Sequence, residues 1–320
     1  MIMPELPEVE TVRIGLSKLI VGKKIAAVWH DWPKGFPNAE EDVNQFMIGA
    51  NVLKLRRRAK VLLIELDTKY SLVIHLKMTG QLVYVGKREI EDRRLKIEEK
   101  QKQSQIHNPQ STEPEVRFGA GHPNESLIGE LPDRSTRVVF DFADGSKLFF
   151  NDQRKFGWVK LYPTVEVPNI EFMKRVGPEP LSSEFTSSEF ASRLQRRKNT
   201  TIKAALLDQT VIAGVGNIYA DESLWGAKIH PTVLVKKLSK NKLNTLFIEL
   251  RYVLELAIEK GGSTDKNYVN AEGKRGSYMD FARVFRREKL PCPRCGTTIE
   301  KSRVAGRGTH TCPKCQKGIR

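Results

Sequence analysis

Four cysteines near the C-terminus form the clearest chemical pattern in the chain. They are its only cysteines, and they follow the spacing C-x2-C-x16-C-x2-C: Cys292, Cys295, Cys312 and Cys315. Each C-x2-C pair can turn two sulfurs toward one metal ion, and four thiolates complete a closed tetrahedral shell around Zn²⁺. The spacing therefore predicts one structural zinc ion. The alternative is a pair of redox-active dithiols, but the surrounding sequence lacks a thioredoxin-like context.

The N-terminus offers a different chemistry, that of a reactive amine. Pro4 follows Met3 and precedes Glu5. If Met3 is the initiator and is removed, the chain begins with a secondary amine, and an α-amine with a pKa of about 8 is partly neutral in the cell. A neutral amine can attack an aldehyde-level carbon to form an iminium, and Glu5 could transfer protons beside it. By themselves, the residues favour a simpler interpretation, a proline that starts a helix.

A surplus of positive charge predicts a polyanionic partner. The chain has 54 lysines and arginines against 38 acidic residues, a formal net charge of +16, which is typical of nucleic-acid-binding proteins. Lys60 lies in a basic run expected on a strand, Arg307 lies near the expected tip of a hairpin between the cysteine pairs, and Asn217 opens a helix after Gly214 and Gly216. Each could contact a phosphate, or be an ordinary surface side chain or helix start.

The sequence gives no indication of a membrane or secreted protein. No apolar run approaches the length of about 18 residues that a transmembrane helix needs. The N-terminal residues lack the apolar core of a secretory signal. We therefore expect a cytoplasmic protein with no membrane partner.

An α+β fold must position these residues. Apolar spacing predicts a helix over residues 4–20. Alternating Val, Ile and Leu predict strands within 23–30, 52–66 and 70–85, and a hairpin over 137–150 that turns at Asp144-Gly145. Helical periods return in the second half of the chain, over 187–197, 201–209, 217–227 and 238–260.

These elements suggest four parts. We expect a mostly β domain over 4–162, a linker over 163–186, a helical domain over 187–284 and a zinc finger over 285–320. A charged surface insertion over 86–134 interrupts the first domain; residues 87–103 could form an exposed helix, and residues 106–126 are turn-rich. Residues 261–285 are expected to form a loop.

A series of segments is similar to motifs of the bacterial formamidopyrimidine-DNA glycosylases and follows the same order. The segments are PELPEVETVR (4–13), RRRAK (56–60), HLKMTGQL (75–82), NDQRKFGW (151–158), GPEPL (177–181), GVGNIYADESLW (214–225), GGST (261–264), VNAEGKRG (269–276) and the GRGTH-containing cysteine tail. They cover nearly the whole chain except the insertion, so the chain is identified as a member of this family. The related endonuclease VIII proteins typically open with PEGPE, and PELPE favours the oxidised-purine branch.

The resemblance implies a fold, a partner and a reaction. The fold would be an N-terminal helix with a β-sandwich domain, then a helical domain with a helix–two-turn–helix unit and a zinc-ribbon hairpin. The protein would be a bacterial, nucleoid-associated monomer acting on double-stranded DNA with oxidised bases or abasic sites, whose target nucleotide leaves the base stack. Pro4 would attack C1′ to form a Schiff base, Glu5 would transfer protons, and β- and δ-elimination would cut the strand.

The resemblance also implies DNA contacts. Met78 and Phe156 would fill the space that the extruded nucleotide leaves, and Arg154 would face the orphaned cytosine. The residues expected to contact phosphates are Lys60, His75, Asn217 and Arg307, and Lys60 is also counted with the catalytic pair. Glu222 would lie near the flipped base, and residues 269–276 would close on the lesion.

Departures from the family pattern leave alternatives open. Met1 and Ile2 precede the expected start, and the amide nitrogen of an internal proline cannot form a Schiff base. Lys77 and Lys155 stand where glycine or arginine is common. The alternatives are an oxidised-pyrimidine glycosylase of the same family, a non-catalytic binder of damaged DNA if Met1 is the true start, and a zinc-ribbon DNA-binding protein without lesion preference.

Overall fold

A helix opens the part of the chain that the structure describes. The computed structural model describes residues 4–87, 115–121, 129–263 and 278–318. Helix α1 (Leu6–Ile20) has a proline in its first turn, and the side chain of Glu8 accepts a hydrogen bond from the backbone N–H of Glu5 at 2.8 Å. Its apolar stripe is buried, as the helical spacing predicts.

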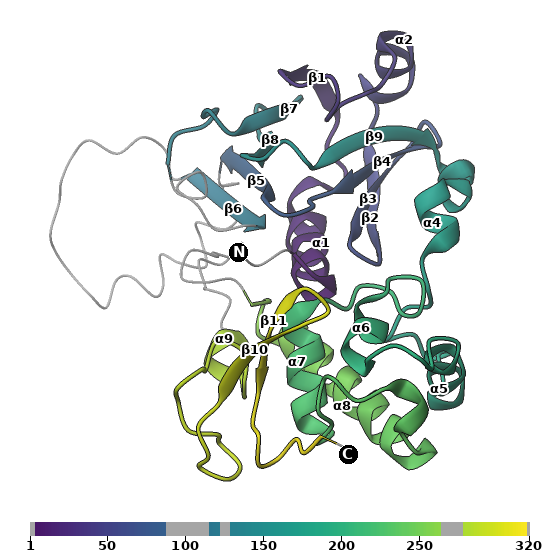
Figure 1. Ribbon diagram of the computed structural model, residues 1–320. Helices are drawn as coiled ribbons and strands as arrows, with labels where there is room; N and C mark the ends of the chain where they lie inside the picture. The colour runs from purple at the N-terminus through teal and green to yellow at the C-terminus, as the bar shows by residue number, and fades with distance from the viewer. Residues whose placement is uncertain (1–3, 88–114, 122–128, 264–277, 319–320) are drawn as a thin grey trace, which may run out of the picture.

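Two antiparallel sheets form the first domain, with α1 against them (Figure 1). One sheet has the order β1-β7-β8-β5-β6: β1 (Ile25–His30), β7 (Thr136–Phe142), β8 (Lys147–Asp152), β5 (Gly80–Lys87) and β6 (Glu115–Gly121). The other has the order β2-β3-β4-β9: β2 (Val52–Arg58), β3 (Val61–Leu66), β4 (Tyr70–His75) and β9 (Trp158–Pro163). Short helical turns α2 (Glu40–Asp42) and η1 (Val43–Met47) join β1 to β2. Both sheets and α1 bury side chains in one shared core, so the β-sandwich expectation is confirmed.

The insertion contains a strand that the sequence did not predict. Strand β6 pairs with β5 from Gln81↔Gly121 to Lys87↔Glu115, and its Phe118 is fully buried against α1. The sequence around β6 is rich in turn-forming residues, so the short strand could not be recognised from composition. Its burial depends on contact with α1, which is distant in the sequence. The helix expected over 87–103 falls almost entirely outside the described residues.

The expected linker is partly folded onto the first domain. Residues 164–175 form η3 (Thr164–Asn169) and α4 (Glu171–Arg175). Val167 and Met173 pack against Val61, Leu63 and Val73 on the outer face of the smaller sheet. β3 carries apolar side chains on both of its faces. The outer face of this sheet must therefore be covered, and η3 and α4 cover it. The connection between the domains is therefore shorter than 163–186.

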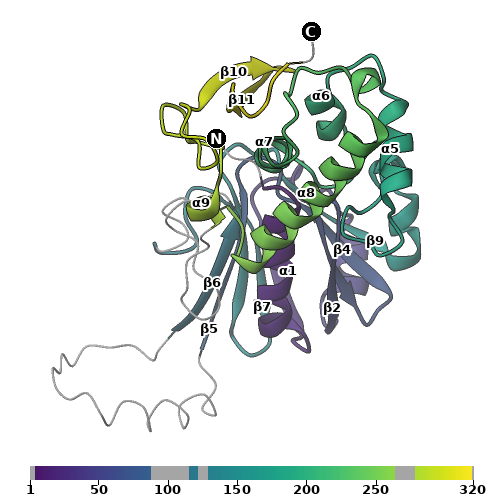
Figure 2. The same ribbon diagram turned by 90° about the horizontal axis from the view of Figure 1, so that it is seen from below.

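The helical domain packs around its longest helix (Figure 2). Its helices are α5 (Ser187–Gln195), α6 (Ile202–Leu207), α7 (Asn217–Gly226), η4 (Val235–Lys237) and α8 (Lys240–Glu259). These match the four helical segments expected from periodicity. A short helix α9 (Tyr278–Phe281) lies in the expected loop 261–285, and β10 (Glu300–Val304) pairs with β11 (Arg307–Thr311) in the cysteine-containing tail. Among the described residues, no helix is long and apolar enough to cross a membrane.

Candidate active site at the domain junction

Residues 4–6 lie between the two domains, against the first turn of α7. The backbone N–H of Leu6 donates to Gly214 O at 3.0 Å, and the N–H of Ile218 donates to Glu5 Oε1 at 3.0 Å. A Cβ at Gly216 would lie 2.2 Å from Glu5 Cδ, and one at Gly214 would lie 2.6 Å from Leu6 Cβ. The two glycines therefore admit the N-terminal segment, and the helix start that we expected to attract phosphate receives the Glu5 carboxylate.

Glu5 is a buried acid whose pKa is raised toward neutral pH. Glu5 is 2% exposed, and the residue before it, Pro4, is also buried. Burial raises its pKa to about 7; Lys60 and the Ile218 and Tyr219 amides oppose this effect, and Glu8 adds to it. Its Oε2 is buried and has no hydrogen-bond partner among the described residues. A carboxyl group with such a pKa can both give and take a proton.

The carboxylate of Glu8 connects three segments around Glu5. The sequence did not predict this role for Glu8. Its Oε2 accepts from the N–H of Glu5, and its Oε1 accepts from the Tyr219 hydroxyl at 2.6 Å and from the N–H and Oγ of Ser263 at 2.8 and 2.9 Å. It therefore connects α1, α7 and the segment after α8. Its place three residues after Glu5 is the one local signal, because that spacing is typical of a capping box.

Lys60 lies in the turn between β2 and β3, whereas we expected it on a strand. Arg58 pairs with Val61, so Ala59 and Lys60 form a two-residue turn, with Ala59 at a φ of 54°. Lys60 is nevertheless 6% exposed. Burial lowers its pKa, Glu5 and Glu8 oppose this shift, and Arg307 reinforces it. The turn thus brings a lysine from the first domain to the buried acid and to the zinc-finger hairpin.

Two other expected phosphate contacts lie together at that hairpin. Arg307 is the first residue after the turn of Ala305 and Gly306, as its expected place near the tip requires. The Asn217 side chain donates to Gly308 O at 3.0 Å. Asn217 therefore braces the hairpin that carries Arg307, beside the first turn of α7.

His75 is buried and uncharged. Its Nδ1 accepts from the N–H of Lys77 at 3.0 Å, so its proton is assigned to Nε2. Burial lowers its pKa to about 3, and Lys77 and Lys60 add to the shift. His75 is thus available as a neutral donor through Nε2–H.

Met78, Arg154 and Phe156 meet on the surface although 76 residues separate the first two. The Arg154 guanidinium lies 3.4 Å from Met78 Sδ and stacks 4.6 Å from the centre of the Phe156 ring. Phe156 is 50% exposed. A surface cluster of two apolar side chains and a guanidinium is a suitable wedge for a disrupted base pair.

A buried carboxylate, Asp152, holds the two turns that carry this cluster. It is 1% exposed and accepts from the Thr79 hydroxyl and from the backbone N–H groups of Arg154, Phe156 and Gly157, the last two at 2.8 and 2.6 Å. Sequence reasoning missed this residue, because the turn at 76–79 reaches Asp152 only in the folded sheet.

Asp152→Asn is expected to lower the free energy of unfolding by about 1–3 kcal/mol, because an amide cannot accept from all of these buried donors. Urea denaturation measures the loss. Asp144→Asn is the matched control: Asp144 also accepts from a turn N–H, that of Ser146 at 3.0 Å, but its side chain is 46% exposed. Equal losses in the two variants would contradict a special role for Asp152.

Lys77 and Lys155 adopt backbone conformations that suit glycine. Their φ values are 53° and 58°, in the left-handed region, where a side chain costs about 1 kcal/mol or more. The preference for glycine in such motifs therefore has a backbone cause here. Lys155 also stacks 4.5 Å from the centre of the Trp32 ring.

Glu222 does not join these groups. Its side chain is fully buried, and its carboxylate accepts from the backbone N–H groups of Arg283, Val284 and Phe285 at 2.8–3.1 Å. Glu222 fastens the segment after α9 to α7, and its place near a flipped base stays a prediction. The expected closing loop 269–276 lies outside the described residues.

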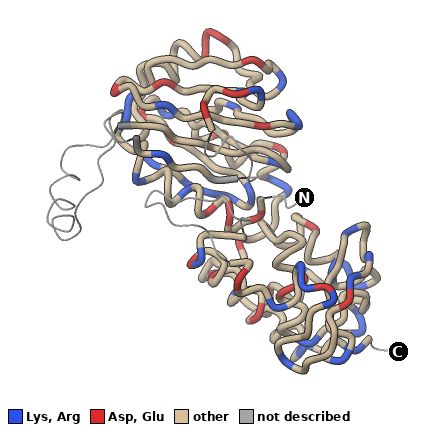
Figure 3. Tube along the Cα trace, turned by 90° about the vertical axis from the view of Figure 1, so that its left-hand side faces the viewer, with Lys and Arg blue, Asp and Glu red and all other residues tan. Residues whose placement is uncertain are grey.

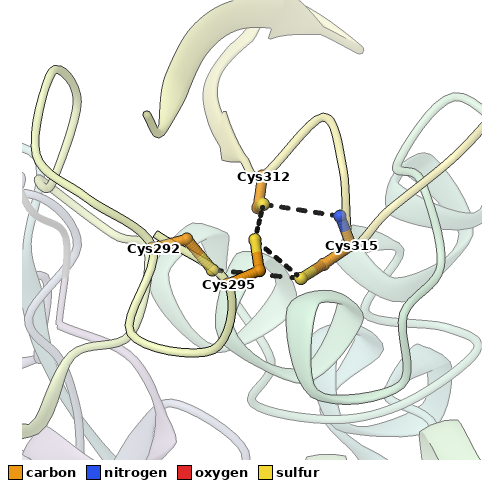
Figure 4. A group of neighbouring side chains, drawn as sticks. All are labelled: Cys292, Cys295, Cys312 and Cys315. Carbon is orange, nitrogen blue, oxygen red and sulfur yellow. Dashed lines mark hydrogen bonds between the residues drawn. The ribbon is translucent and has the colours of Figure 1, made fainter. Parts of the chain in front are cut away.

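The four cysteines converge as their spacing predicts (Figure 4). Their sulfurs all lie within 4.8 Å of one another, with pairs at 3.5–3.9 Å. Zn–S bonds of about 2.3 Å require tetrahedral sulfur separations of about 3.8 Å. The geometry fits one structural zinc ion held by Cys292, Cys295, Cys312 and Cys315.

The zinc finger is fastened to α7. Lys203, fully buried, donates to Asp221 Oδ1 at 2.6 Å and to Thr309 Oγ1 at 2.7 Å, and Asp221 Oδ2 accepts from the His310 N–H at 2.9 Å. Trp225 packs against the cysteines, and the Arg294 guanidinium stacks 3.8 Å from its ring centre. The hairpin with Arg307 thus depends on both the metal and α7.

Removal of zinc by a chelator is expected to unfold the finger, since metal-binding energy is folding energy in such sites. The affinity for duplex DNA should fall about tenfold or more as Arg307 loses its support. Trp225 fluorescence and DNA binding are measured together, with zinc restored as the control. Unchanged amide exchange in β10 and β11 after chelation would contradict the prediction.

Together these features define a two-domain protein with a buried acid–lysine site at the domain junction, a structural zinc finger and basic residues on both domains (Figure 3). Family models agree with this architecture. Residues 3–159 match the formamidopyrimidine-DNA glycosylase N-terminal domain, residues 176–268 its H2TH domain, and residues 289–318 a zinc finger found in FPG and IleRS. The chain belongs to the formamidopyrimidine-DNA glycosylase family.

Individual relatives match over almost their full length. The chain is 40% identical over 316 residues to the formamidopyrimidine-DNA glycosylase of Herpetosiphon aurantiacus, covering 98% of this chain and 100% of the relative. It is 37% identical to that of Latilactobacillus sakei, with 98% of each covered. A Lactococcus lactis Fpg complex with abasic-site DNA superposes with a TM-score of 0.79 at 32% identity, covering 98% and 99% of the two chains. The Thermus thermophilus MutM (Fpg) protein gives 0.76 at 34% identity, with 99% and 100% covered.

Proposed function

We propose that this chain is a DNA glycosylase and apurinic/apyrimidinic lyase that excises oxidised purines, 8-oxoguanine and formamidopyrimidines, in base-excision repair. The observation that carries the proposal is the buried Pro4-Glu5 pair at the domain junction, with the Glu5 pKa raised to about 7 and Lys60 beside it. Solved relatives from Lactococcus lactis hold DNA with an abasic site or with Fapy-dG. Such DNA presents the sugar carbon that an amine can attack.

The reaction begins when the neutral amine of Pro4 attacks C1′ of the damaged nucleotide. The bond from C1′ to the base breaks, the base leaves with the electron pair, and the proton that the Pro4 nitrogen loses goes to the departing base. The protonated Glu5 carboxyl gives its proton to the sugar ring oxygen as the ring opens and the iminium forms. The Glu5 carboxylate then takes a C2′ proton, and the 3′ phosphate is expelled. Loss of the C4′ proton expels the 5′ phosphate in a second elimination, and water hydrolyses the remaining iminium to release Pro4.

The remaining site residues hold the distorted duplex. Lys60 and Arg307 offer cations to the backbone, and His75 offers a neutral N–H. Met78, Arg154 and Phe156 enter the space that the extruded nucleotide leaves, which stabilises a kink. The active species is a monomer on double-stranded DNA.

The lyase step requires a free amine on Pro4, which borohydride trapping tests directly. Protein that starts at Met3 and protein that keeps Met1 are each incubated with duplexes carrying 8-oxoguanine opposite cytosine, and the crosslinked peptide is identified by mass. We expect a crosslink at Pro4 only in the Met3 form.

A duplex with thymine glycol is the matched substrate control. Faster processing of thymine glycol than of 8-oxoguanine would transfer the proposal to an oxidised-pyrimidine glycosylase. Lesion binding with no crosslink in either protein would leave a non-catalytic binder of damaged DNA.

A further inference from the structure

A glutamate in the segment between the domains contacts the turn that carries Lys60. Glu179, in the GPEPL segment, accepts from Arg57 Nη1 at 2.8 Å, from Arg58 Nη1 at 2.9 Å and from the N–H of Ala59 at 2.6 Å. Burial by itself raises the pKa of Glu179, but Arg57, the Ala59 amide and Arg58 hold it below its ordinary value. One ionised carboxylate thus binds three successive residues of the β2–β3 hairpin.

The two arginines extend this contact in opposite directions. Arg57 Nε donates to Glu10 Oε2 of α1 at 2.8 Å. Arg58 Nη2 donates to the carbonyls of Val176 and Gly177 at 3.1 and 2.6 Å. The hairpin is therefore clamped between α1 and the interdomain segment by charge-assisted hydrogen bonds.

The interdomain segment is in turn fastened to the helical domain. The N–H of Gly177 donates to Gln209 O at 2.8 Å, and Pro178 O accepts from the N–H of Ala213 at 2.9 Å. A Cβ at Gly177 would lie 2.8 Å from Thr210 O, so the backbones are in close contact. The connection before α7, which contains Gln209 and Ala213, continues to Gly214. The carbonyl of Gly214 accepts a hydrogen bond from the N–H of Leu6. Glu179 therefore lies where the hairpin, the connection before α7 and the N-terminal segment are all held.

We propose that Glu179 is a positioning residue for Lys60: it anchors the β2–β3 turn to the interdomain segment and thereby places the lysine beside Glu5. Nothing in this role requires Glu179 to touch DNA. Glutamine at this position has one acceptor oxygen in place of two, and its NH2 group would face an arginine donor. The two partly buried arginines would also lose the negative charge that they share and would repel each other. The turn is then free to move Lys60 away from the buried acids. The consequence for catalysis rests on the proposed function, whereas the placement of Lys60 does not.

Lysine labelling tests the placement without reference to activity. Full-length protein is treated with a limiting acetylating reagent, and the labelled peptides are quantified by mass. Lys60 should react slowly in the unaltered protein because it is 6% exposed, and Lys54, with a side chain 61% exposed, is the reference. In Glu179→Gln, Lys60 should react about tenfold faster relative to Lys54, as burial of the amine is lost. The fully buried Lys203 reports global unfolding and should stay protected.

Two further variants make the result specific. Arg58→Lys keeps the charge but cannot bind Glu179 and two carbonyls at once, so it should expose Lys60 as Glu179→Gln does. Asp31→Asn breaks a comparable ion pair in the first domain, with Arg137 at 2.6 Å and side-chain exposures of 31% and 8%. It should leave Lys60 protected. Lys60 labelling at the unaltered rate in both Glu179→Gln and Arg58→Lys would overturn the inference.

Excision kinetics then separate this inference from the proposed function. Single-turnover base release should fall about tenfold or more in Glu179→Gln at saturating protein, because small displacements of catalytic groups are costly. Lys60 lowers the pKa of Glu5, so its displacement should also move the pH midpoint upward. The other titratable groups that act on Glu5 stay in place: Glu8, Lys203, Tyr219 and Tyr278.

Two outcomes distinguish the proposals. If the unaltered protein is inactive, the proposed function alone is refuted. If the unaltered protein is active and Glu179→Gln has the same rate and the same pH midpoint, the catalytic consequence of this inference is refuted.

Discussion

Glu5→Gln is expected to slow base release by a factor of about 10²–10⁴, the usual contribution of a general acid–base group. The amide keeps the size of the side chain and an acceptor for the N–H of Ile218, but it has no proton to transfer. The unaltered carboxyl has a pKa raised to about 7 by burial, so near neutral pH a large fraction is protonated and able to donate. Single-turnover excision from duplex DNA measures the loss.

The pH dependence identifies the group. A donor with a raised pKa is fully protonated well below pH 7 and loses its proton as the pH rises through about 7. The descending limb of the pH–rate profile should therefore have its midpoint near pH 7, and Glu5→Gln should lack this limb.

The matched control is Glu65→Gln, at a buried glutamate on β3 that pairs with Lys54 and Arg56 and is 7% exposed. Its excision rate and pH profile should match those of the unaltered protein. A Glu5→Gln rate within a few-fold of the unaltered rate would remove Glu5 from the mechanism.

Gly216→Ala is expected to cost about 10² in the excision rate by displacing Glu5. The added Cβ would lie 2.2 Å from Glu5 Cδ and 2.4 Å from Oε1, so the carboxylate must leave the first turn of α7. The φ of Gly216 is −131°, which any residue adopts, so the effect is steric. A displacement of about 1 Å in a reacting group can account for a loss of this size.

Gly15→Ala provides an equally severe steric control away from the site. Its Cβ would lie 2.2 Å from the Phe118 ring in the core of the first domain. Overpacking of this kind costs about 1–3 kcal/mol of stability. Both variants should therefore lose stability in thermal denaturation, but only Gly216→Ala should lose activity in the folded state. Equal rates in the two variants would show that Glu5 tolerates the displacement.

Both predictions depend on the contact between the domains. Glu5 precedes α1 of the first domain, its N–H partner is on α7 of the second, and Glu8 also binds Ser263 after α8. Burial at this contact is also the largest cause of the raised Glu5 pKa. Because α7 of the second domain also contacts Glu5, mutations in the interdomain segment are expected to change its titration.

The sequence by itself determined the features that depend on nearby residues. The cysteine spacing identified the metal ligands, because each C-x2-C pair is a local unit. Apolar periodicity predicted α1 and the helices of the second domain, and alternation with a turn at Asp144-Gly145 predicted the β7–β8 hairpin. The order of short motifs then indicated the family, and it named Met78, Arg154 and Phe156, which the structure places side by side.

Only the tertiary structure decided the features that arise from burial and distant contacts. No local pattern distinguishes Glu5, whose pKa is raised, from Glu179, whose pKa is lowered, because desolvation and the neighbouring charges come from remote parts of the chain. For the same reason, the sequence did not indicate that Glu222, Asp152 and Glu8 hold backbone N–H groups of other segments. Nor did it indicate strand β6, which lies in a polar insertion. Long-range contacts set the environment of a charged side chain, and that environment decides whether the group binds, braces or transfers a proton.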